Sequence, residues 1–326
     1  MTDPRQKVQV MIRFDLRSPA FGAATRDLYR ESIDMAEYAD QHGFDFVNLS
    51  EHHGSDDGYN PSPIVLGGAM AARTRKLRIT LGALILPLHD PIRVAEDVAA
   101  LDNISAGRVT LVAAAGYVPS EFAMFGRAMQ GRGRVLEEGV EVLRRAWSGE
   151  PFEYRGSTVK VTPRPVQDPL PVLMGGSTPV AARRAARIAD GFVTHLPDLY
   201  RVYEQEAVAL GKHPAPFVEP GPGFVHVTRD PQRDWQRIAA HAMHEMNAYG
   251  AWAEQAGLVS SYHKVDSLEA LRDSGGYAVV TPEQCIELAR RHRKVSLHPL
   301  MGGMDPALGW ASLRLFVEAV LPRIGE

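Results

Sequence analysis

The chain has 326 residues, with 36 Lys and Arg against 39 Asp and Glu, so its formal net charge is −3. Hydrophobic residues make up 45% of it, which is enough for a large core and excludes disorder as the main state. The single cysteine, Cys285, excludes an internal disulfide and a cysteine-rich zinc site.

The distribution of residues excludes two kinds of partner. The longest nearly apolar stretch, residues 81–88, is far shorter than a membrane span and contains Pro87, so no membrane partner is expected. Basic residues are scattered through helix-like segments such as residues 181–191, so no nucleic-acid partner is expected either. The N-terminus is polar and lacks a signal-peptide core, which predicts a cytoplasmic protein.

Short apolar runs alternate with helical patterns along the chain. The first run, residues 8–14, precedes a helix at residues 25–41 whose apolar residues share one face. Further helices are predicted at residues 62–74, from 91, at 132–147 and from 179. Strands are predicted near residues 8–14, 44–49, 78–86, 108–115, 171–175, 191–194, 223–227 and 295–299. Continuously apolar strands separated by helices indicate a parallel sheet, and eight of them predict an α/β fold of the (β/α)8 TIM-barrel class.

A recurring dipeptide marks the predicted helix starts. An N-cap residue precedes a proline at Asp90, Thr178, Thr281 and Asp305, and Thr281 forms a capping box with Gln284. Asp90, Thr178 and Asp305 each follow a strand after only a few residues. The connecting loops therefore lie at the carboxyl ends of the strands, which is the working face of such a barrel.

The chain is expected to form one domain, residues 1–326. Two segments depart from its alternation of strands and helices. Residues 151–171 predict a β-hairpin after the fourth helix, with a turn at Arg155 and Gly156, followed by a proline-rich connector. Residues 231–280 exceed one crossover helix and are expected to form an insertion after the seventh strand, a lid over the barrel mouth.

Candidate chemistry begins at the end of the second strand. Alternation along a strand would point Glu51 and His53 one way and His52 the other, so one histidine is expected to work alone. Glu51 and Glu121 are the acidic residues that stand out near predicted strand ends. Composition leaves a two-carboxylate glycosidase open.

No metal site is expected. His241 and His244 are three residues apart beside Glu245, whereas a zinc-binding helix motif places its histidines four apart, and no third ligand is recognisable. His241, His244 and Tyr249 are expected to be lid residues that pack or touch substrate. Cys285 lies inside a predicted helix, which does not favour a nucleophile.

Small residues at strand ends predict room for a ligand. Three alanines and Gly116 close the fourth strand, which leaves space for something flat. Two glycine pairs predict anion sites, because free backbone N–H groups and a helix start bind phosphate. They are Gly175 and Gly176, followed by Ser177 and Thr178, and Gly302 and Gly303 at the eighth strand. Neither pair lies in a GxGxxG or Walker motif, so a Rossmann or P-loop interpretation fails.

Several stretches, in this order, resemble the bacterial luciferase-like superfamily of flavin-dependent oxidoreductases. They are SEHH at residues 50–53, the run from ARTRKL to GRVTL at 72–111, AAGYVPSEFAMFG at 114–126, RRAWSGEPFEYRG at 144–156 and MGGSTPVAARRAARIADG at 174–191. The resemblance covers residues 8–195 densely and the last forty residues more loosely. It implies a (β/α)8 barrel that binds FMN, or in some branches coenzyme F420, at its carboxyl face.

The resemblance also implies roles for individual residues. His52 matches the family's active-site histidine near the reactive edge of the flavin. The peptide between Gly82 and Ala83 matches one, often non-proline cis, that supports the isoalloxazine ring. The ribityl-phosphate segment is matched by Ala115, Gly116 and Tyr117, and the phosphate grip by Gly175, Gly176, Ser177 and Thr178. Ala115 stands where the luciferases place an arginine, so one charge is missing and the flavin is expected to exchange as a substrate.

The expected function is a two-component monooxygenase. Reduced FMN from a separate flavin reductase would react with O2 in a dry apolar pocket, and a small organic substrate would be oxygenated. His52 would donate a hydrogen bond or a proton there. The main alternative is an F420-dependent hydride-transfer enzyme on the same fold, in which oxygen takes no part. The second alternative is a non-catalytic flavin-binding barrel.

The substrate and the oligomeric state are not readable from motifs. Phe14, His244 and Tyr249 are candidate substrate or lid residues. The resemblance favours a homodimer built on the helices after the second and third strands, where small residues would permit close packing: Gly67, Gly68, Ala69 and Ala71.

Overall fold

The computed structural model describes residues 7–258 and 260–325, so the first six residues, which entered the location prediction, lie outside the described part. The chain forms two compact units. The first takes in residues up to 48, residues 55–60 and residues from 218 onward, and the second takes in residues 49–54 and 61–217.

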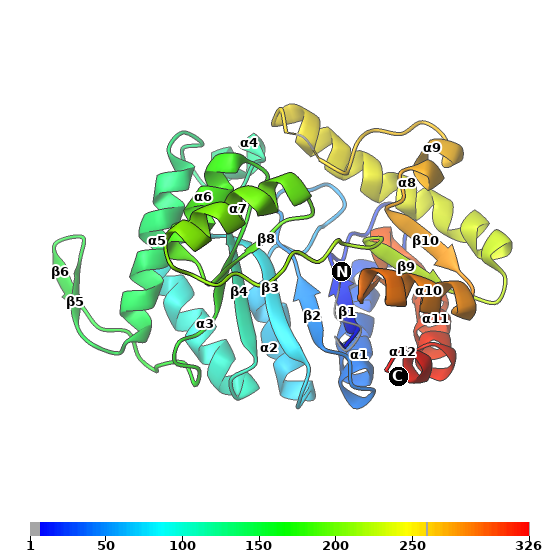
Figure 1. Ribbon diagram of the computed structural model, residues 1–326, viewed down its shortest axis with the longest axis horizontal. Helices are drawn as coiled ribbons and strands as arrows, with labels where there is room; N and C mark the ends of the chain where they lie inside the picture. Colours follow the sequence, from blue (N-terminus) through cyan, green and yellow to red (C-terminus); the bar gives the residue numbers. More distant parts are fainter. Residues whose placement is uncertain (1–6, 259, 326) are drawn as a thin grey trace. The chain divides into compact units, whose positions relative to one another are not determined.

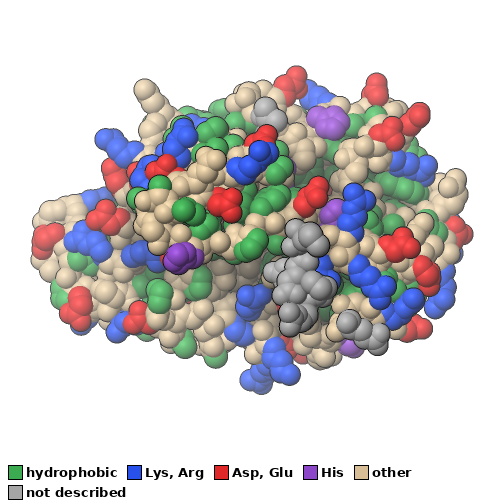
Figure 2. Space-filling model, viewed as in Figure 1, with side chains coloured by type: hydrophobic (Ala, Val, Ile, Leu, Met, Phe, Trp, Pro, Cys, Tyr) green, Lys and Arg blue, Asp and Glu red, His purple; other side chains and the backbone are tan. Residues whose placement is uncertain are grey.

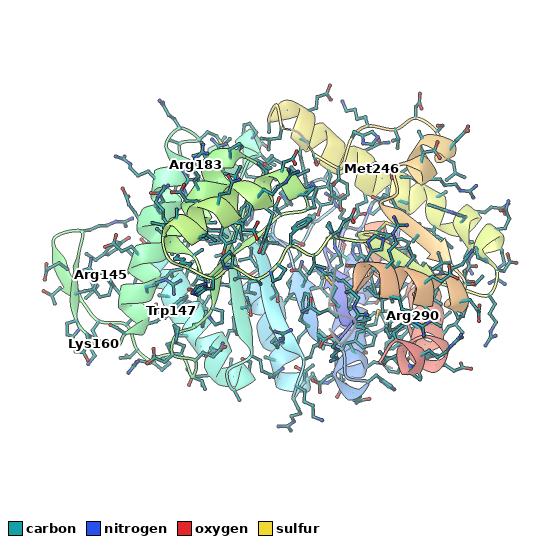
Figure 3. The ribbon with its side chains drawn as sticks, viewed as in Figure 1. Arg145, Trp147, Lys160, Arg183, Met246 and Arg290 are labelled. Carbon is teal, nitrogen blue, oxygen red and sulfur yellow. The ribbon has the colours of Figure 1, made fainter. Side chains whose placement is uncertain are left out.

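The strands of the first unit are parallel. Their order is β10-β9-β11-β1-β2, and Gln9 of β1 pairs with Lys294 of β11. The helix α8 packs on β9 and β10 through a buried cluster that includes Met246, which is labelled in Figure 3. The elements of this unit are β1 (Gln9–Phe14), α1 (Thr25–Gln41), β2 (Phe46–Leu49, whose last residue belongs to the second unit), β9 (Phe224–Val227), α8 (Pro231–Gln255), α9 (Leu268–Asp273), β10 (Tyr277–Val280), α10 (Pro282–His292), β11 (Lys294–Leu297), η2 (Met301–Gly303), α11 (Pro306–Ala319) and α12 (Leu321–Ile324).

The second unit repeats the same parallel pattern in the order β3-β4-β7-β8. The antiparallel hairpin β5–β6 projects beyond α5 (Figure 1), and the indole of Trp147 at its base donates to the Ala95 carbonyl at 3.0 Å. The elements are α2 (Pro63–Arg73), β3 (Arg78–Ile85), η1 (Leu86–Leu88), α3 (Pro91–Ser105), β4 (Val109–Ala114), α4 (Pro119–Met124), α5 (Arg132–Trp147), β5 (Phe152–Tyr154), β6 (Ser157–Val159), β7 (Val172–Gly175), α6 (Pro179–Ile188), β8 (Gly191–Val193) and α7 (Pro197–Ala209).

Most predicted elements are confirmed. All eight strands form within three residues of their predicted ends, and the hairpin turns at Arg155 and Gly156. Each predicted N-cap side chain accepts a hydrogen bond from its helix, and Thr281 forms the expected capping box. The caps match because Asp and Thr before proline satisfy first-turn N–H groups whatever the tertiary context.

The lid prediction is wrong in part. β10 is a ninth strand, paired in parallel with β9, and it lies inside the segment that was expected to be an insertion. One face of α8 also belongs to the core, since Ile238, Ala242 and Met246 are buried against β9 and β10. The run YAVV is short and follows a Ser–Gly–Gly turn, so its strand character was hidden in a long segment dominated by helix patterns.

Acidic and basic side chains are interspersed over the face shown in Figure 2. No helix among the described residues is long and apolar enough to cross a membrane.

Candidate functional site

The segment that follows β2 carries a buried histidine pair, held by a glutamate from α4. Oε1 of Glu121 lies 2.7 Å from Nδ1 of His52 and accepts the backbone N–H of His53 at 2.9 Å. Glu121, His52 and His53 are 1%, 7% and 8% exposed. One carboxylate oxygen therefore fixes both the ring of His52 and the backbone beside it.

A second buried carboxylate holds the other histidine. Oε1 of Glu51 lies 2.9 Å from Nε2 of His53 and 2.6 Å from Nε2 of His89, and the same carboxylate accepts the N–H of Ile85 at the end of β3. Burial works to raise the pKa of Glu51, but the hydrogen bonds from His53, His89 and Ile85 outweigh it and lower the pKa to about 2. Glu51 is therefore ionised at neutral pH.

The two carboxylates assign tautomers to adjacent histidines. An ionised Glu51 can only accept, so His53 donates through Nε2. His52 turns its Nδ1 to Oε1 of Glu121, so the carboxylate favours a proton on that ring nitrogen. The alternation predicted for Glu51, His52 and His53 is confirmed, because His53 pairs with Glu51 while His52 turns to Glu121.

Small residues from three neighbouring strands form a half-buried surface in the same unit. A Cβ atom added to Gly175 would lie 3.9 Å from Cβ of Ala114 and 4.0 Å from Cβ of Ala83, so these residues of β7, β4 and β3 adjoin one another. Gly82, Ala83, Ala114 and Gly175 are all partly exposed. The peptide between Gly82 and Ala83 is cis, as the resemblance implied.

The turn after β4 requires glycine and is held by an arginine. Gly116 has φ +72°, and a Cβ there would lie 2.6 Å from Cγ2 of Ile85 and 2.9 Å from Cε2 of Phe122. Nε of Arg132, at the start of α5, donates to the Gly116 carbonyl at 3.0 Å. Tyr117 lies edge-on to the ring of His52, with 5.7 Å between centroids. The sequence did not predict Arg132. Its guanidinium lies beside the segment in which Ala115 stands where the luciferases place an arginine.

The loop after β7 leads directly into a helix start. Thr178 caps α6 by accepting the N–H of Ala181 at 3.2 Å, and Gly175, Gly176 and Ser177 precede it, partly exposed. The positive end of a ten-residue helix therefore lies beside the small-residue surface. A flat ring on Ala83, Ala114 and Gly175, with a phosphate at the α6 start, fits these donors and this space.

The remaining predicted site residues lie in the first unit. Gly302 and Gly303 have φ of +56° and +78°, and a Cβ on them would lie 2.6 Å from the His241 carbonyl oxygen and 2.9 Å from Cδ of Pro19. Close packing alone thus explains both glycines. Phe14 is fully buried at the end of β1.

His244 and Tyr249 project from α8 into a buried cluster around Arg17. Nε2 of His244 donates to Asp57 at 2.7 Å, and the guanidinium of Arg17 pairs with the same carboxylate. The Arg17 guanidinium also lies 4.7 Å from the ring centroids of Tyr59, Tyr249 and Trp252. Sequence reasoning missed Arg17 and Asp57, because each stands in a loop without a motif.

A looser polar cluster adjoins Arg17 in the first unit. His298 lies 3.4 Å from Asp15 and 3.5 Å from Glu245, and Arg13 lies 3.7 Å from Glu245. Oδ2 of Asp15, Oε1 of Glu245 and both ring nitrogens of His298 are buried and make no hydrogen bond. These groups interact through charge over distances longer than a hydrogen bond. His241, which was considered as a metal ligand, instead donates to the Gly302 carbonyl at 2.8 Å.

Comparisons with known proteins show what the chain is similar to. The chain matches the luciferase-like monooxygenase family over residues 9–297. It is 35% identical over 208 residues to an F420-dependent glucose-6-phosphate dehydrogenase of Nakamurella multipartita, covering 58% of each chain. It is 32% identical over 145 residues to a 4-hydroxyprotoasukamycin monooxygenase of Streptomyces nodosus subsp. asukaensis, covering 42% of this chain and 39% of that one.

A solved structure matches nearly the whole chain. The monooxygenase RslO1 from Streptomyces bottropensis shares 27% identity over 96% of this chain and 99% of its own, with a TM-score of 0.76. The chain spans only about half the length of the curated relatives it matches. The predicted fold class is confirmed, and the chain belongs to the luciferase-like monooxygenase family of oxidoreductases.

Proposed function

We propose that the chain is a flavin-dependent monooxygenase that uses reduced FMN and O2 to oxygenate a small organic substrate. The observation that carries this is the juxtaposition, in one unit, of a glutamate-held histidine with a surface of small residues that leads to a helix start. The relatives named as monooxygenases support the oxygenating chemistry. We infer a cytoplasmic enzyme that receives its reduced flavin from a separate reductase.

The residues of the second unit divide the binding of FMN among them. Gly82, Ala83 and Gly175 offer the flat surface for the ring. The helix start at Thr178 receives the phosphate with the N–H groups of Gly175, Gly176 and Ser177. The ribityl chain, which joins the ring to the phosphate, passes beside Ala115, Gly116 and Tyr117. Reduced FMN, when bound, supplies the electrons that activate O2.

His52 transfers the proton that the chemistry requires. Its Nδ1 is fixed by Glu121, so its Nε2 accepts a proton and returns it without rotation of the ring. Burial of His52, His53 and Glu121 keeps bulk water away from this exchange. In the first unit, Gly302 and Gly303 remain proposed coenzyme contacts, and Phe14, His244 and Tyr249 remain proposed substrate or lid contacts.

We also propose a homodimer built on α2 and α3, with fewer contact residues than the sequence predicted. Gly67 and Ala71 are buried, and a Cβ on Gly67 would lie 3.3 Å from Leu101, so these two pack inside the unit. Gly68 has open space around its Cα, and Val65 and Ile104 are 72% and 57% exposed. The contact surface would use the outward residues only.

A second candidate is F420-dependent hydride transfer, with His52 moving a proton to or from the substrate. The dehydrogenase relative, which is 35% identical over 208 residues, favours it. A non-catalytic flavin-binding protein is the third candidate, and the buried His52–Glu121 pair argues against it, because a carrier needs no oriented proton acceptor.

Anaerobic titration with reduced FMN and, separately, reduced F420, each followed by mixing with O2, tests the proposal. Binding of FMN with an oxygen-dependent change in the absorption spectrum is expected, and His52→Ala should keep the binding and alter the oxygen step. Preference for F420 without a response to oxygen would move the chemistry to hydride transfer. Binding of neither would overturn both.

A further inference from the structure

The buried carboxylate of Glu51 joins two parts of the second unit that are distant in sequence, its own segment after β2 and residues 85–89. Its two oxygens accept from His53 after β2, from Ile85 at the end of β3 and from His89 after η1. Glu51 is 2% exposed, and an isolated carboxylate in such a place would be strongly unfavourable. Three donors converge on it, so its negative charge is what holds these parts together.

The elements that Glu51 joins are those that carry the proposed site. His52 stands between Glu51 and His53, and Gly82 and Ala83 precede Ile85 on β3. Glu121 fixes the same segment through the His53 N–H and the His52 ring. Two carboxylates therefore hold the histidine segment, Glu121 by direct contact with His52 and Glu51 through His53.

We propose that Glu51 is a positioning residue, which sets the tautomer of His53 and fixes the end of β3 against the histidine segment, so that coenzyme binding depends on its negative charge. This inference rests on the proposed function. His89 is the more exposed of the two histidines that contact Glu51, because its side chain is 28% exposed. It also lines, with Glu51, a cavity of about 270 Å³ between α2 and α3.

Glu51→Gln keeps the shape and removes the charge, and it is tested with His89→Asn, which removes one donor. Glu96→Gln is the matched control, since Glu96 only pairs with Arg93 on the surface of α3. The first readout is the 15N spectrum of the histidine rings without coenzyme. Glu51→Gln should shift the ring signals of His53 and leave the Nδ1–H signal of His52 in place, because Glu121 is intact. A general loss of structure would shift both.

The second readout is the dissociation constant of reduced FMN. Loss of hydrogen bonds to a charged group should raise it about 10- to 100-fold in Glu51→Gln and less in His89→Asn, with no change in Glu96→Gln. Unchanged His53 signals, or an unchanged dissociation constant, would overturn the positioning role. If the wild-type chain binds neither coenzyme, the proposed function fails, and the ring signals alone decide whether Glu51 sets His53.

Discussion

The two units bury charged groups in different ways. In the second unit, Glu51 and Glu121 each accept short hydrogen bonds, at 2.5–2.9 Å, from histidines and backbone N–H groups. In the first unit, Asp57 also accepts a short bond from His244, but Asp15 and Glu245 lie 3.4 and 3.5 Å from His298, and several atoms of these three residues make no hydrogen bond. Short, directed hydrogen bonds fix the positions of the groups they join, whereas charges that interact at longer range require only that opposite charges balance. The second unit is thus suited to orient a proton, and the first is most sensitive to the loss of a charge.

The largest effect is expected from Arg17→Met in the first unit. The substitution keeps much of the volume between the aromatic rings but leaves the carboxylates of Asp15 and Asp57 without their buried cation. Unfolding in urea should show a loss of about 3–5 kcal/mol, the usual cost of breaking a buried ion pair on one side. Arg26→Met, on a side chain that is 90% exposed, is the control and should change little. Equal losses in both variants would contradict the importance of charge balance around Arg17.

The next largest effect is expected in acid, where the two units should lose stability at different pH values. The pKa of Glu51 falls from an ordinary 4.5 to about 2, so its contribution to stability is present above pH 4.5 and is lost as pH falls towards 2. This contribution is worth about 3 kcal/mol. Glu51→Gln should therefore flatten the pH dependence of unfolding between pH 4.5 and 2.

Below that range the first unit should dominate, because the pKa values of Asp15 and Asp57 are held lower still. Burial opposes this in both, but His298 and Arg17 outweigh it at Asp15, as His244 and Arg17 do at Asp57. An acid unfolding curve that Glu51→Gln leaves unchanged would show that this carboxylate is not held ionised.

A smaller effect is expected from Gly116→Ala. The new Cβ would clash with Ile85 and Phe122, and φ is +72°, so a loss of about 1–3 kcal/mol should follow. Gly126→Ala is the matched control, since Gly126 has φ +61° with nothing within 4 Å of its Cβ position. It should lose about 1 kcal/mol from backbone strain alone. The difference between the two, measured by denaturant unfolding, isolates the packing against β3.

The smallest effect is expected from Glu138→Ala on the surface of α5. Glu138 pairs with Arg134 at 3.5 Å, and both side chains are more than half exposed. Such a pair contributes about 0.5 kcal/mol or less. A loss as large as that of Gly116→Ala would mean that the exposed face of α5 is covered by something outside this chain.

Local chemistry decided which features the sequence could predict. The caps at Asp90, Thr178, Thr281 and Asp305 were predictable because they depend on neighbouring residues, and strand alternation predicted that Glu51 and His53 point the same way, though not that they pair. Resemblance, not spacing, supplied the cis peptide before Ala83 and the role of His52.

Features that depend on distant contacts were missed. Arg132 approaches Gly116 across a turn that no motif marks, and His89 reaches Glu51 from 38 residues away. Arg17 finds its aromatic rings on a helix more than 230 residues later in the chain. β10 was hidden in the same way, because its four residues pair only with β9.

The central claim is that the small-residue surface of β3, β4 and β7 receives the flavin ring, and Gly175→Leu tests it most directly. Gly175 has no positive φ, and its Cβ position meets only ordinary contacts, so the substitution should leave unfolding nearly unchanged while a bulky side chain covers Ala83 and Ala114. The measurement is the dissociation constant of reduced FMN under anaerobic conditions for the wild type and this variant. The account predicts a rise of at least about tenfold, since one lost contact surface is worth about 1.4 kcal/mol or more. Equal binding by a folded Gly175→Leu variant would place the flavin elsewhere and contradict the proposed site.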